Sequence, residues 1–197
     1  KILGLSEGKI GIIPNGIDVE KGFNYQRSLE AENLKEKYGI TENEKVILYV
    51  GRLVKMKRVE IIFKVIEKLV NQGIKVKALI VGSGAQRAKL EKMAYPIRRN
   101  IVFTGYISEG RKYECYRIAD LFILPSLSEG LPTVLLEAAL FELPIVATNT
   151  NGIPDIIIHG KTGFLANKWS YNQYDDFAQH ILTNENLARK MGENARK

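Results

Sequence analysis

The sequence is poor in the residues that make disulfides and zinc sites. Its 197 residues include one cysteine, Cys115, two histidines and one tryptophan. A single cysteine excludes an internal disulfide, so core packing must hold the fold, and a reducing, cytoplasmic compartment is favoured. His159 and His180 lack cysteines or carboxylates at zinc-site spacing, so we expect no metal. No apolar run approaches the ~18 residues of a membrane span and the first residues lack a signal-peptide pattern, so we expect no passage through a bilayer.

The composition is that of a globular domain with excess positive charge. Hydrophobic residues make up 45% and charged residues 26%, and 29 basic against 22 acidic residues give a net charge of +7. The length predicts one domain over residues 1–197. The charge is compatible with nucleic acid, a phosphate ligand or an acidic membrane surface as partner. Nucleic acid is disfavoured because the tyrosines do not alternate with basic residues along one stripe.

Short apolar runs alternate with helix-period segments along most of the chain, after a polar loop and helix within 20–45. This alternation is typical of βαβ units and predicts a doubly wound α/β domain, with a parallel sheet and helices on both faces. In such sheets ligands bind beyond the carboxyl ends of the strands. We expect strands at 46–50, 76–81, 101–103, 121–124 and 145–147, and helices at 59–70, 85–94, 109–119, 132–141, 153–158 and, in two pieces that meet near Asn184, 171–194.

Two cations follow the first of these strands. Gly51 closes the strand, Arg52 comes next, and Lys57 lies five residues later at the start of a helix. Cations beside the free N–H groups of a helix N-terminus are what a diphosphate needs. The alternative is a solvated basic loop, to which we assign Lys55 and Arg58.

A second helix start follows the strand at 121–124. Pro132 suits the first position of a helix, where its missing N–H costs nothing. The backbone amides of Gly130, Leu131 and Thr133 are then candidates to face an anion, and glycine lets that anion approach closely. This segment therefore predicts a second contribution to a phosphate site.

Two glutamates accompany this helix. Glu137 is the only charged residue from Pro132 to Phe141, so on a mostly buried helix it needs a partner. At 1.5 Å per residue it lies about 7 Å beyond Pro132, a reach that suits the ribose attached to a diphosphate. Glu129 precedes the helix, where a carboxylate can accept hydrogen bonds from a sugar or stabilise a developing cation. The alternative makes Glu129 a partner of the helix dipole and Glu137 half of a surface ion pair.

Two known phosphate-binding signatures are absent. The turn Gly82-Ser83-Gly84 fails as a dinucleotide fingerprint because Arg87 replaces the third glycine and Thr104 stands where an acid is required. That failure disfavours a dehydrogenase. The run from Gly160 to Thr162 fails as a phosphate loop because Asp155 replaces its first glycine.

Taken together, the motifs resemble the C-terminal, donor-binding domain of a retaining family-4 (group 1) glycosyltransferase with the two-Rossmann-domain (GT-B) fold. Each motif is weak alone, but their order and spacing are specific, and the resemblance covers nearly the whole chain. The motifs are Ile13-Pro14-Asn15-Gly16-Ile17-Asp18 with Phe23, Gly51-Arg52-Leu53 with Lys57, Val81-Gly82-Ser83-Gly84, Phe103-Thr104-Gly105, Pro125-Ser126, Glu129 with Glu137, Pro144-Ile145-Val146-Ala147-Thr148, Gly152-Ile153-Pro154-Asp155 and Gly160-Lys161-Thr162-Gly163-Phe164-Leu165.

The resemblance implies a role for each of these positions. Arg52 and Lys57 would hold the diphosphate of a nucleotide-sugar donor and stabilise it as leaving group, and Glu129 would contact the donor sugar. Glu137 would bind the ribose, and backbone near Tyr106 would meet the base. The donor-binding residues so implied are Gly51, Gly82, Gly84, Tyr106, Gly130, Leu131, Pro132, Thr133 and Glu137.

The resemblance also implies what accompanies the domain. No metal or other cofactor is expected, because the two cations would do the metal's electrostatic work. An N-terminal acceptor domain of the same parent protein would complete the enzyme, so we expect this chain to be inactive alone. The location would be cytoplasmic, with the excess charge suiting the acidic inner face of a membrane.

Three positions depart from the family pattern. Functions other than sugar transfer also stay open. Arg58, Glu142 and Asn151 stand where the family usually has glycine, which bears on the fine geometry of the pocket. A non-catalytic module that binds a nucleotide or glycan is the main alternative to an enzyme. A nucleic-acid binder is a further one, although the glutamates near the expected site argue against it.

Overall fold

The computed structural model describes residues 15–20, 22 and 31–197, and its centre is a six-stranded sheet. All strand pairs are parallel, in the order β3-β2-β1-β4-β5-β6. The strands are β1 (Lys45–Val50), β2 (Val76–Val81), β3 (Ile101–Gly105), β4 (Leu121–Leu124), β5 (Ile145–Thr148) and β6 (Gly163–Ala166). The doubly wound α/β fold predicted from the sequence is confirmed.

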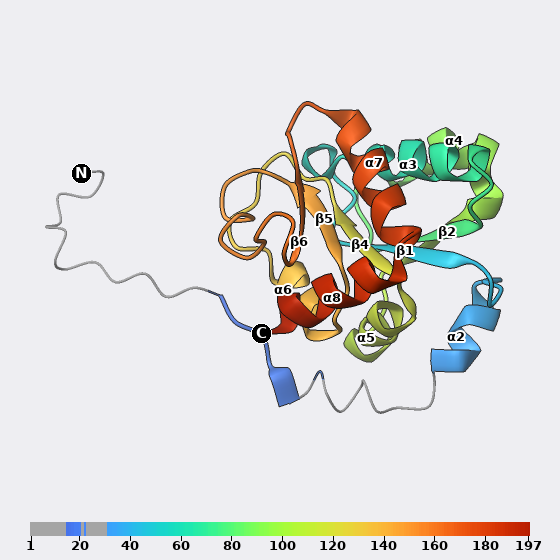
Figure 1. The fold of residues 1–197 in the computed structure, drawn as a ribbon. Helices are drawn as coiled ribbons and strands as arrows, with labels where there is room; N and C mark the ends of the chain where they lie inside the picture. The colour runs from blue at the N-terminus through green and yellow to red at the C-terminus, as the bar shows by residue number, and fades with distance from the viewer. Residues whose placement is uncertain (1–14, 21, 23–30) are drawn as a thin grey trace, which may run out of the picture.

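Helices cover both faces of the sheet. In Figure 1, α3, α4 and α7 lie on one face, whereas α2, α5 and α6 lie on the other, with α8 beside α6. The helices are α2 (Ala31–Lys37), α3 (Glu60–Asn71), α4 (Arg87–Ala94), α5 (Glu109–Ile118), α6 (Thr133–Leu140), α7 (Tyr171–Leu182) and α8 (Glu185–Arg196), with 3-10 turns η2 (Lys55–Lys57) and η3 (Tyr95–Asn100).

The core lies between the sheet and these helices. Every residue of β2 and β4 is buried, as continuous apolar runs covered on both faces require. The apolar stripe of α3 packs against the sheet through Ile62, Phe63, Ile66 and Leu69. Val70, which the same spacing placed on this stripe, is 37% exposed.

The connection between β5 and β6 differs from the prediction. The expected helix at 153–158 is absent, and the segment forms successive turns. Pro154 has no N–H to donate, and three β-branched isoleucines at 156–158 are poor helix formers, so the bonds from Ile156 and Ile157 to the Ile153 carbonyl end in one turn. The four-residue strand β6 was not predicted, because the sequence analysis treated 160–165 only as a motif.

The remaining boundaries agree closely with the sequence. Helix α6 begins at Thr133, and Pro132 precedes it with extended backbone rather than forming its first residue. The C-terminal helices meet at Asn184, whose side chain accepts a 3.0 Å hydrogen bond from the Leu187 N–H. The motif residues Ile13, Pro14 and Phe23 lie outside the described residues. Across 15–20, 22 and 31–197, no helix is long and apolar enough to cross a membrane.

Candidate functional site

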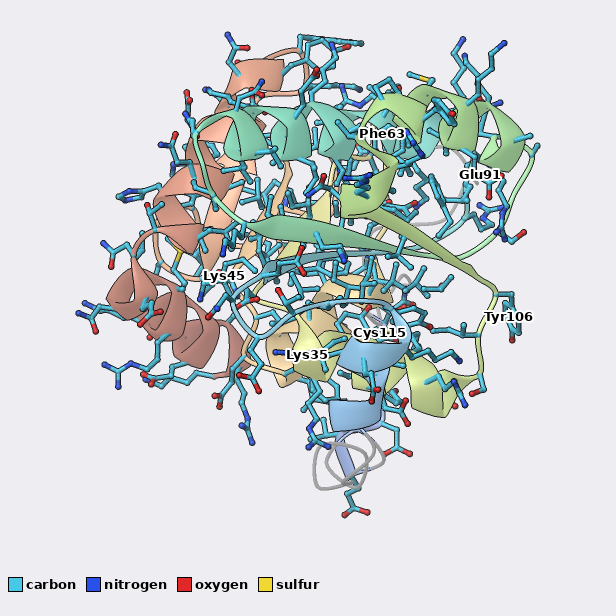
Figure 2. All side chains as sticks on the ribbon, turned by 90° about the vertical axis from the view of Figure 1, so that its right-hand side faces the viewer. Lys35, Lys45, Phe63, Glu91, Tyr106 and Cys115 are labelled. Atoms are coloured by element: carbon cyan, nitrogen blue, oxygen red, sulfur yellow. The ribbon has the colours of Figure 1, made fainter. Side chains whose placement is uncertain are left out.

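A cavity opens where β1, β2 and β3 end. Its volume is about 290 Å³, and four predicted site residues, Gly51, Arg52, Gly82 and Tyr106, lie around it. Figure 2 shows Tyr106 standing out at the end of β3, where it is 88% exposed. The other lining residues are Val50, Val81, Ser83, Ile107 and Lys112. The carboxyl edge of the sheet therefore brings these residues together, as the topology predicted.

Two glycines set the shape of this edge. Gly82 has a φ of +132°, and a Cβ there would lie 2.0 Å from the Gly51 carbonyl oxygen. At Gly84, with a φ of +158°, a Cβ would lie 2.5 Å from the Leu53 carbonyl oxygen. The loop after β2 can therefore pack against the loop after β1 only with glycine at both positions. Gly84 supports the loop and is not among the residues that line the cavity.

Lys57 and Glu129 meet beside the cavity. The Lys57 ammonium forms an ion pair with Glu129 Oε1, and the two side chains are 17% and 11% exposed. The backbone reinforces the contact, because the Leu127 N–H donates a 2.8 Å hydrogen bond to the Met56 carbonyl. The loop after β1 and the loop after β4 are thus joined at the position where the sequence placed a diphosphate and a sugar. Arg52, by contrast, has an exposed side chain.

The start of α6 lies on the loop that carries Glu129. Gly130 is exposed, Leu131 and Thr133 are half-buried, and Pro132 is buried. The Leu131 carbonyl accepts a 3.0 Å hydrogen bond from Asn15 Nδ2, which belongs to a motif far earlier in the chain.

Glu137 is buried and paired, which differs from the surface ion pair considered as its alternative. Its Oε1 accepts a 2.7 Å hydrogen bond from Lys112 Nζ, and the Glu137 side chain is 9% exposed. Within the described part of the chain its other oxygen, Oε2, is buried without a hydrogen-bond partner. A buried carboxylate oxygen without a donor is costly, and the neighbouring Tyr116 hydroxyl is a donor within its surroundings.

Lys112 was missed by the sequence analysis. It comes from the first turn of α5 and links the cavity, which it lines, to Glu137 on α6. The sequence contained weak evidence for this role. A lysine in the first turn of a helix is disfavoured by the helix dipole, and an anionic partner offsets that cost.

Two buried tyrosines adjoin these carboxylates. Burial, and after it the charge of Glu137, raises the pKa of Tyr116 well above its usual value. Burial, and after it the charge of Glu129, raises the pKa of Tyr49, whose hydroxyl donates a 3.0 Å hydrogen bond to the Arg52 carbonyl. Both hydroxyls therefore stay protonated and act as donors at neutral pH.

Arg58 was assigned wrongly to a solvated loop. Its side chain is directed into the protein, and the residue is 5% exposed. The guanidinium donates to the carbonyls of Pro125 and Lys168, at 2.8 and 2.6 Å. Its neighbour Lys55 is exposed, as expected. Sequence alone did not reveal the difference because the acceptors come from segments 67 and 110 residues away.

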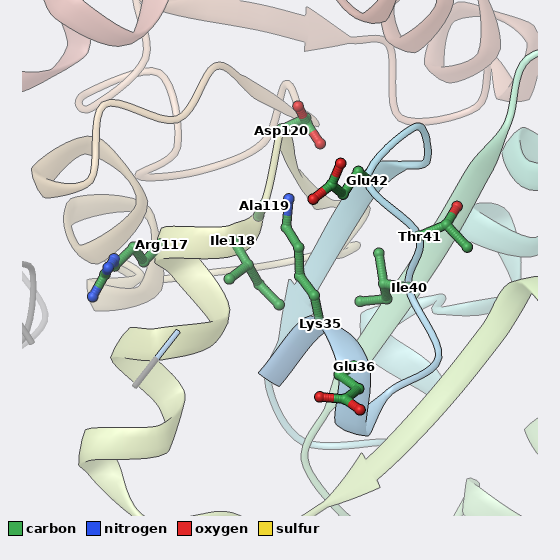
Figure 3. Close-up of a pocket in the computed structure, with 9 residues that line it drawn as sticks. All are labelled: Lys35, Glu36, Ile40, Thr41, Glu42, Arg117, Ile118, Ala119 and Asp120. Carbon is green, nitrogen blue, oxygen red and sulfur yellow. The ribbon is translucent and has the colours of Figure 1, made fainter. Parts of the chain in front are cut away.

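A larger cavity, of about 950 Å³, lies at the opposite, amino edge of the sheet. Figure 3 shows Lys35 of α2 reaching toward Glu42 and Asp120, while Arg117 points away from them. None of the predicted site residues lines this cavity, so its size does not mark it as the donor site. In the described segments no cluster of three His, Cys, Asp or Glu side chains could hold a metal ion.

Comparison with known proteins assigns the chain to a family. The family model for glycosyl transferases group 1 matches residues 30–197. The chain belongs to this family. Among curated relatives of this group 1 domain, N-acetyl-alpha-D-glucosaminyl L-malate synthase of Bacillus anthracis is 33% identical over 165 residues, covering 83% of the chain and 42% of the relative.

Solved structures show the same fold around a nucleotide. Staphylococcus aureus TarM, solved in complex with UDP and other ligands, matches with a TM-score of 0.73 and 28% identity over 78% of this chain and 31% of TarM. Anabaena HepE, solved with UDP and glucose, matches with a TM-score of 0.80 and 21% identity over 92% of this chain and 50% of HepE. The group 1 domain described here spans about half the length of the curated relatives it matches.

Proposed function

We propose that this domain binds a nucleoside-diphosphate sugar, and that the whole protein transfers the sugar to an acceptor with retention of anomeric configuration. The observation that carries the proposal is the cavity at the carboxyl edge of the sheet, which Arg52 and Lys112 line and which Lys112 links to the buried carboxylate of Glu137. A ribose hydroxyl is a donor of the right kind for Glu137 Oε2. Lys112, which holds the other oxygen, fixes the carboxylate for that contact.

The donor would lie along the carboxyl edge of the sheet. The base would enter the cavity between Val50, Val81 and Ile107, with Tyr106 at its mouth. The diphosphate would run toward Arg52, Lys57 and the amides of residues 130–133. Because the relative TarM was solved with UDP, a uridine nucleotide is the first donor to test.

Charge neutralisation is the chemistry this arrangement favours. Breaking the bond between sugar and diphosphate leaves negative charge on the leaving phosphate, and fixed cations stabilise that charge. We assign this role to Arg52 and Lys57, and we propose that transfer needs no metal or other cofactor. Glu129 would turn from Lys57 to the donor sugar when the diphosphate takes its place.

The proposal extends to the rest of the protein. An N-terminal domain of the same chain would supply the acceptor site, so this chain alone would bind the donor without transferring the sugar. We place the protein in the cytoplasm, at the inner face of a membrane if its acceptor is lipid-linked, because a net charge of +7 favours an acidic surface.

A thermal-shift panel tests donor binding. UDP, GDP, ADP and dTDP, each with and without an attached sugar, are compared, since a ligand at about 100 times its dissociation constant adds about 2.7 kcal/mol of stability. Replacing Arg52 and Lys57 together by alanine should abolish the shift, whereas Lys190→Ala, an exposed lysine on α8, should not. A flat panel for the unmodified protein contradicts the proposal.

Transfer is tested in the whole protein. NMR of the product reports the anomeric configuration, and turnover that persists in EDTA supports metal independence. Binding without turnover on any acceptor would instead favour a non-catalytic nucleotide-binding or glycan-binding module.

A further inference from the structure

Arg58 connects the turn that carries Lys57 to four other segments. Its Nε donates to the Pro125 carbonyl at 2.8 Å and its Nη1 to the Lys168 carbonyl at 2.6 Å. Its Nη2 lies 3.3 Å from Thr148 Oγ1 and 3.5 Å from the Tyr174 hydroxyl. These partners follow β4 and β6, end β5 and belong to α7, so one side chain holds the carboxyl ends of several elements at fixed positions.

The site is built for an arginine although its backbone suits glycine. Arg58 has a φ of +46° and a ψ of +44°, in the left-handed region that arginine adopts only at a cost. Within 15–20, 22 and 31–197 no carboxylate forms an ion pair with it, and the residue is 5% exposed. A buried, strained cation without a counter-ion is expensive for the fold, so its presence points to a task beyond packing.

The neighbouring residue, Lys57, indicates what this task is. Lys57 is the last residue of η2, and the Arg58 N–H closes this turn on the Lys55 carbonyl at 3.3 Å. On the other side, Arg58 holds Pro125, at the beginning of the loop that leads to Glu129. The two residues of the Lys57–Glu129 ion pair are therefore carried by two segments that the Arg58 guanidinium joins.

We propose that Arg58 is a positioning residue, which acts through Lys57 by holding its ammonium where the donor diphosphate lies. The inference rests on the proposed function, since it assigns Lys57 to the diphosphate. The guanidinium is buried and its hydrogen bonds go to protein groups, so we assign it no contact with the donor. Lysine at position 58 could keep the charge but could not reach all four acceptors, because it lacks the planar fork of donors.

The test is a double-mutant cycle on UDP binding, measured by calorimetry in the whole protein. Arg58→Gly removes the guanidinium and keeps the left-handed backbone without strain, and Lys57→Ala removes the contact through which it acts. We expect each single variant to weaken UDP binding at least tenfold, and the double variant to bind UDP within threefold of Lys57→Ala alone. Uridine, which has no phosphate, should bind all four proteins within threefold of one another.

Other variants separate positioning from packing. Glu142→Gly is the matched control, because Glu142 also has a positive φ, of +56°, and its carboxylate pairs with Arg196 on α8, apart from the cavity lining. It should leave UDP affinity unchanged. Arg58→Lys, which retains the charge if Arg58→Gly fails to fold, should also weaken UDP binding at least tenfold while leaving uridine binding unchanged.

The outcomes separate a failure of the proposed donor-binding function from a failure of the positioning role of Arg58. If Lys57→Ala leaves UDP affinity unchanged, the proposed function is wrong. If Lys57→Ala weakens UDP binding but its effect and that of Arg58→Gly multiply, or if the Arg58 variants weaken uridine binding equally, Arg58 acts on the fold and the inference is overturned. A crystal structure of either Arg58 variant gives a readout independent of binding, since an intact Lys57–Glu129 contact also overturns it.

Discussion

Glu129→Gln should make the protein bind UDP more tightly while lowering sugar transfer. In the free protein the Glu129 carboxylate forms an ion pair with the Lys57 ammonium, and both side chains are largely buried. A diphosphate that approaches Lys57 must displace this carboxylate and is repelled by it. Glutamine keeps the shape of the side chain and removes both effects.

The size of the gain follows from the charges. Two unit charges ~6 Å apart interact by about 2.8 kcal/mol at an effective dielectric of ~20, and by about 1.4 kcal/mol at ~40, which suits the mouth of a site. We therefore expect UDP affinity to rise about tenfold. The gain should shrink in high salt, because screening weakens charge repulsion at a partly exposed site. Transfer should fall about a hundredfold or more, since Glu129 is assigned to the donor sugar.

Calorimetric titration with UDP, at low and high salt, measures the first effect. Glu142→Gln is the matched control, because the Glu142 carboxylate also pairs with a cation, Arg196 on α8, and Glu142 is assigned no contact with the donor. Unchanged or weaker UDP binding by Glu129→Gln would refute the competition between carboxylate and diphosphate. A gain that the Glu142 variant shares would show only a general effect of net charge.

Three further predictions follow from buried or shifted groups. Lys112→Met leaves Glu137, whose side chain is 9% exposed, without its cation. Urea unfolding should show a loss of about 3–5 kcal/mol in the free energy of unfolding, and a loss under about 0.5 kcal/mol contradicts the pairing. Burial raises the pKa of the Cys115 thiol to about 12, so a maleimide at pH 8 should label it only after unfolding, and rapid native labelling contradicts this. At Glu44 burial alone would raise the pKa, but hydrogen bonds from Thr41 and the Lys77 charge outweigh burial and lower the pKa. The resulting stabilisation of the fold is present at neutral pH and is lost as pH falls through the lowered pKa. Glu44→Gln should therefore lower the melting temperature at pH 7 and have little effect on it at pH 2.

The fold was predictable because its signals are local. A strand buried on both faces is a largely apolar run, and 76–81, apolar apart from Lys77, was assigned correctly to its last residue. The break at Asn184 carried a capping side chain visible in the sequence. By contrast, β6 is four residues long, with a glycine at its first position, and lies at the edge of the sheet beside β5. Its conformation depends on that partner strand, which no local pattern reports.

The site was predictable where topology alone brings residues together. Arg52, Gly82 and Tyr106 follow neighbouring strands, so any parallel sheet in this order places them at one edge. The Lys112–Glu137 pair was not predictable, because it joins two helices across 25 residues and depends on how α5 and α6 are oriented. The sequence showed that Glu137 needed a partner, and only packing identified it.

Three residues of this chain other than glycine adopt left-handed backbone, and each makes a distant side-chain contact. Arg58, Glu142 and Asn151 all keep a positive φ, of +46°, +56° and +44°. Left-handed backbone costs a non-glycine residue about 1–3 kcal/mol, and each side chain makes a distant contact that offsets it. Asn151 Nδ2 donates to Ser128 Oγ at 2.8 Å, one residue before Glu129, and Arg58 holds the same loop at its beginning. Two of these three residues therefore anchor the loop that presents Glu129, so the side chains of the strained positions constrain this loop.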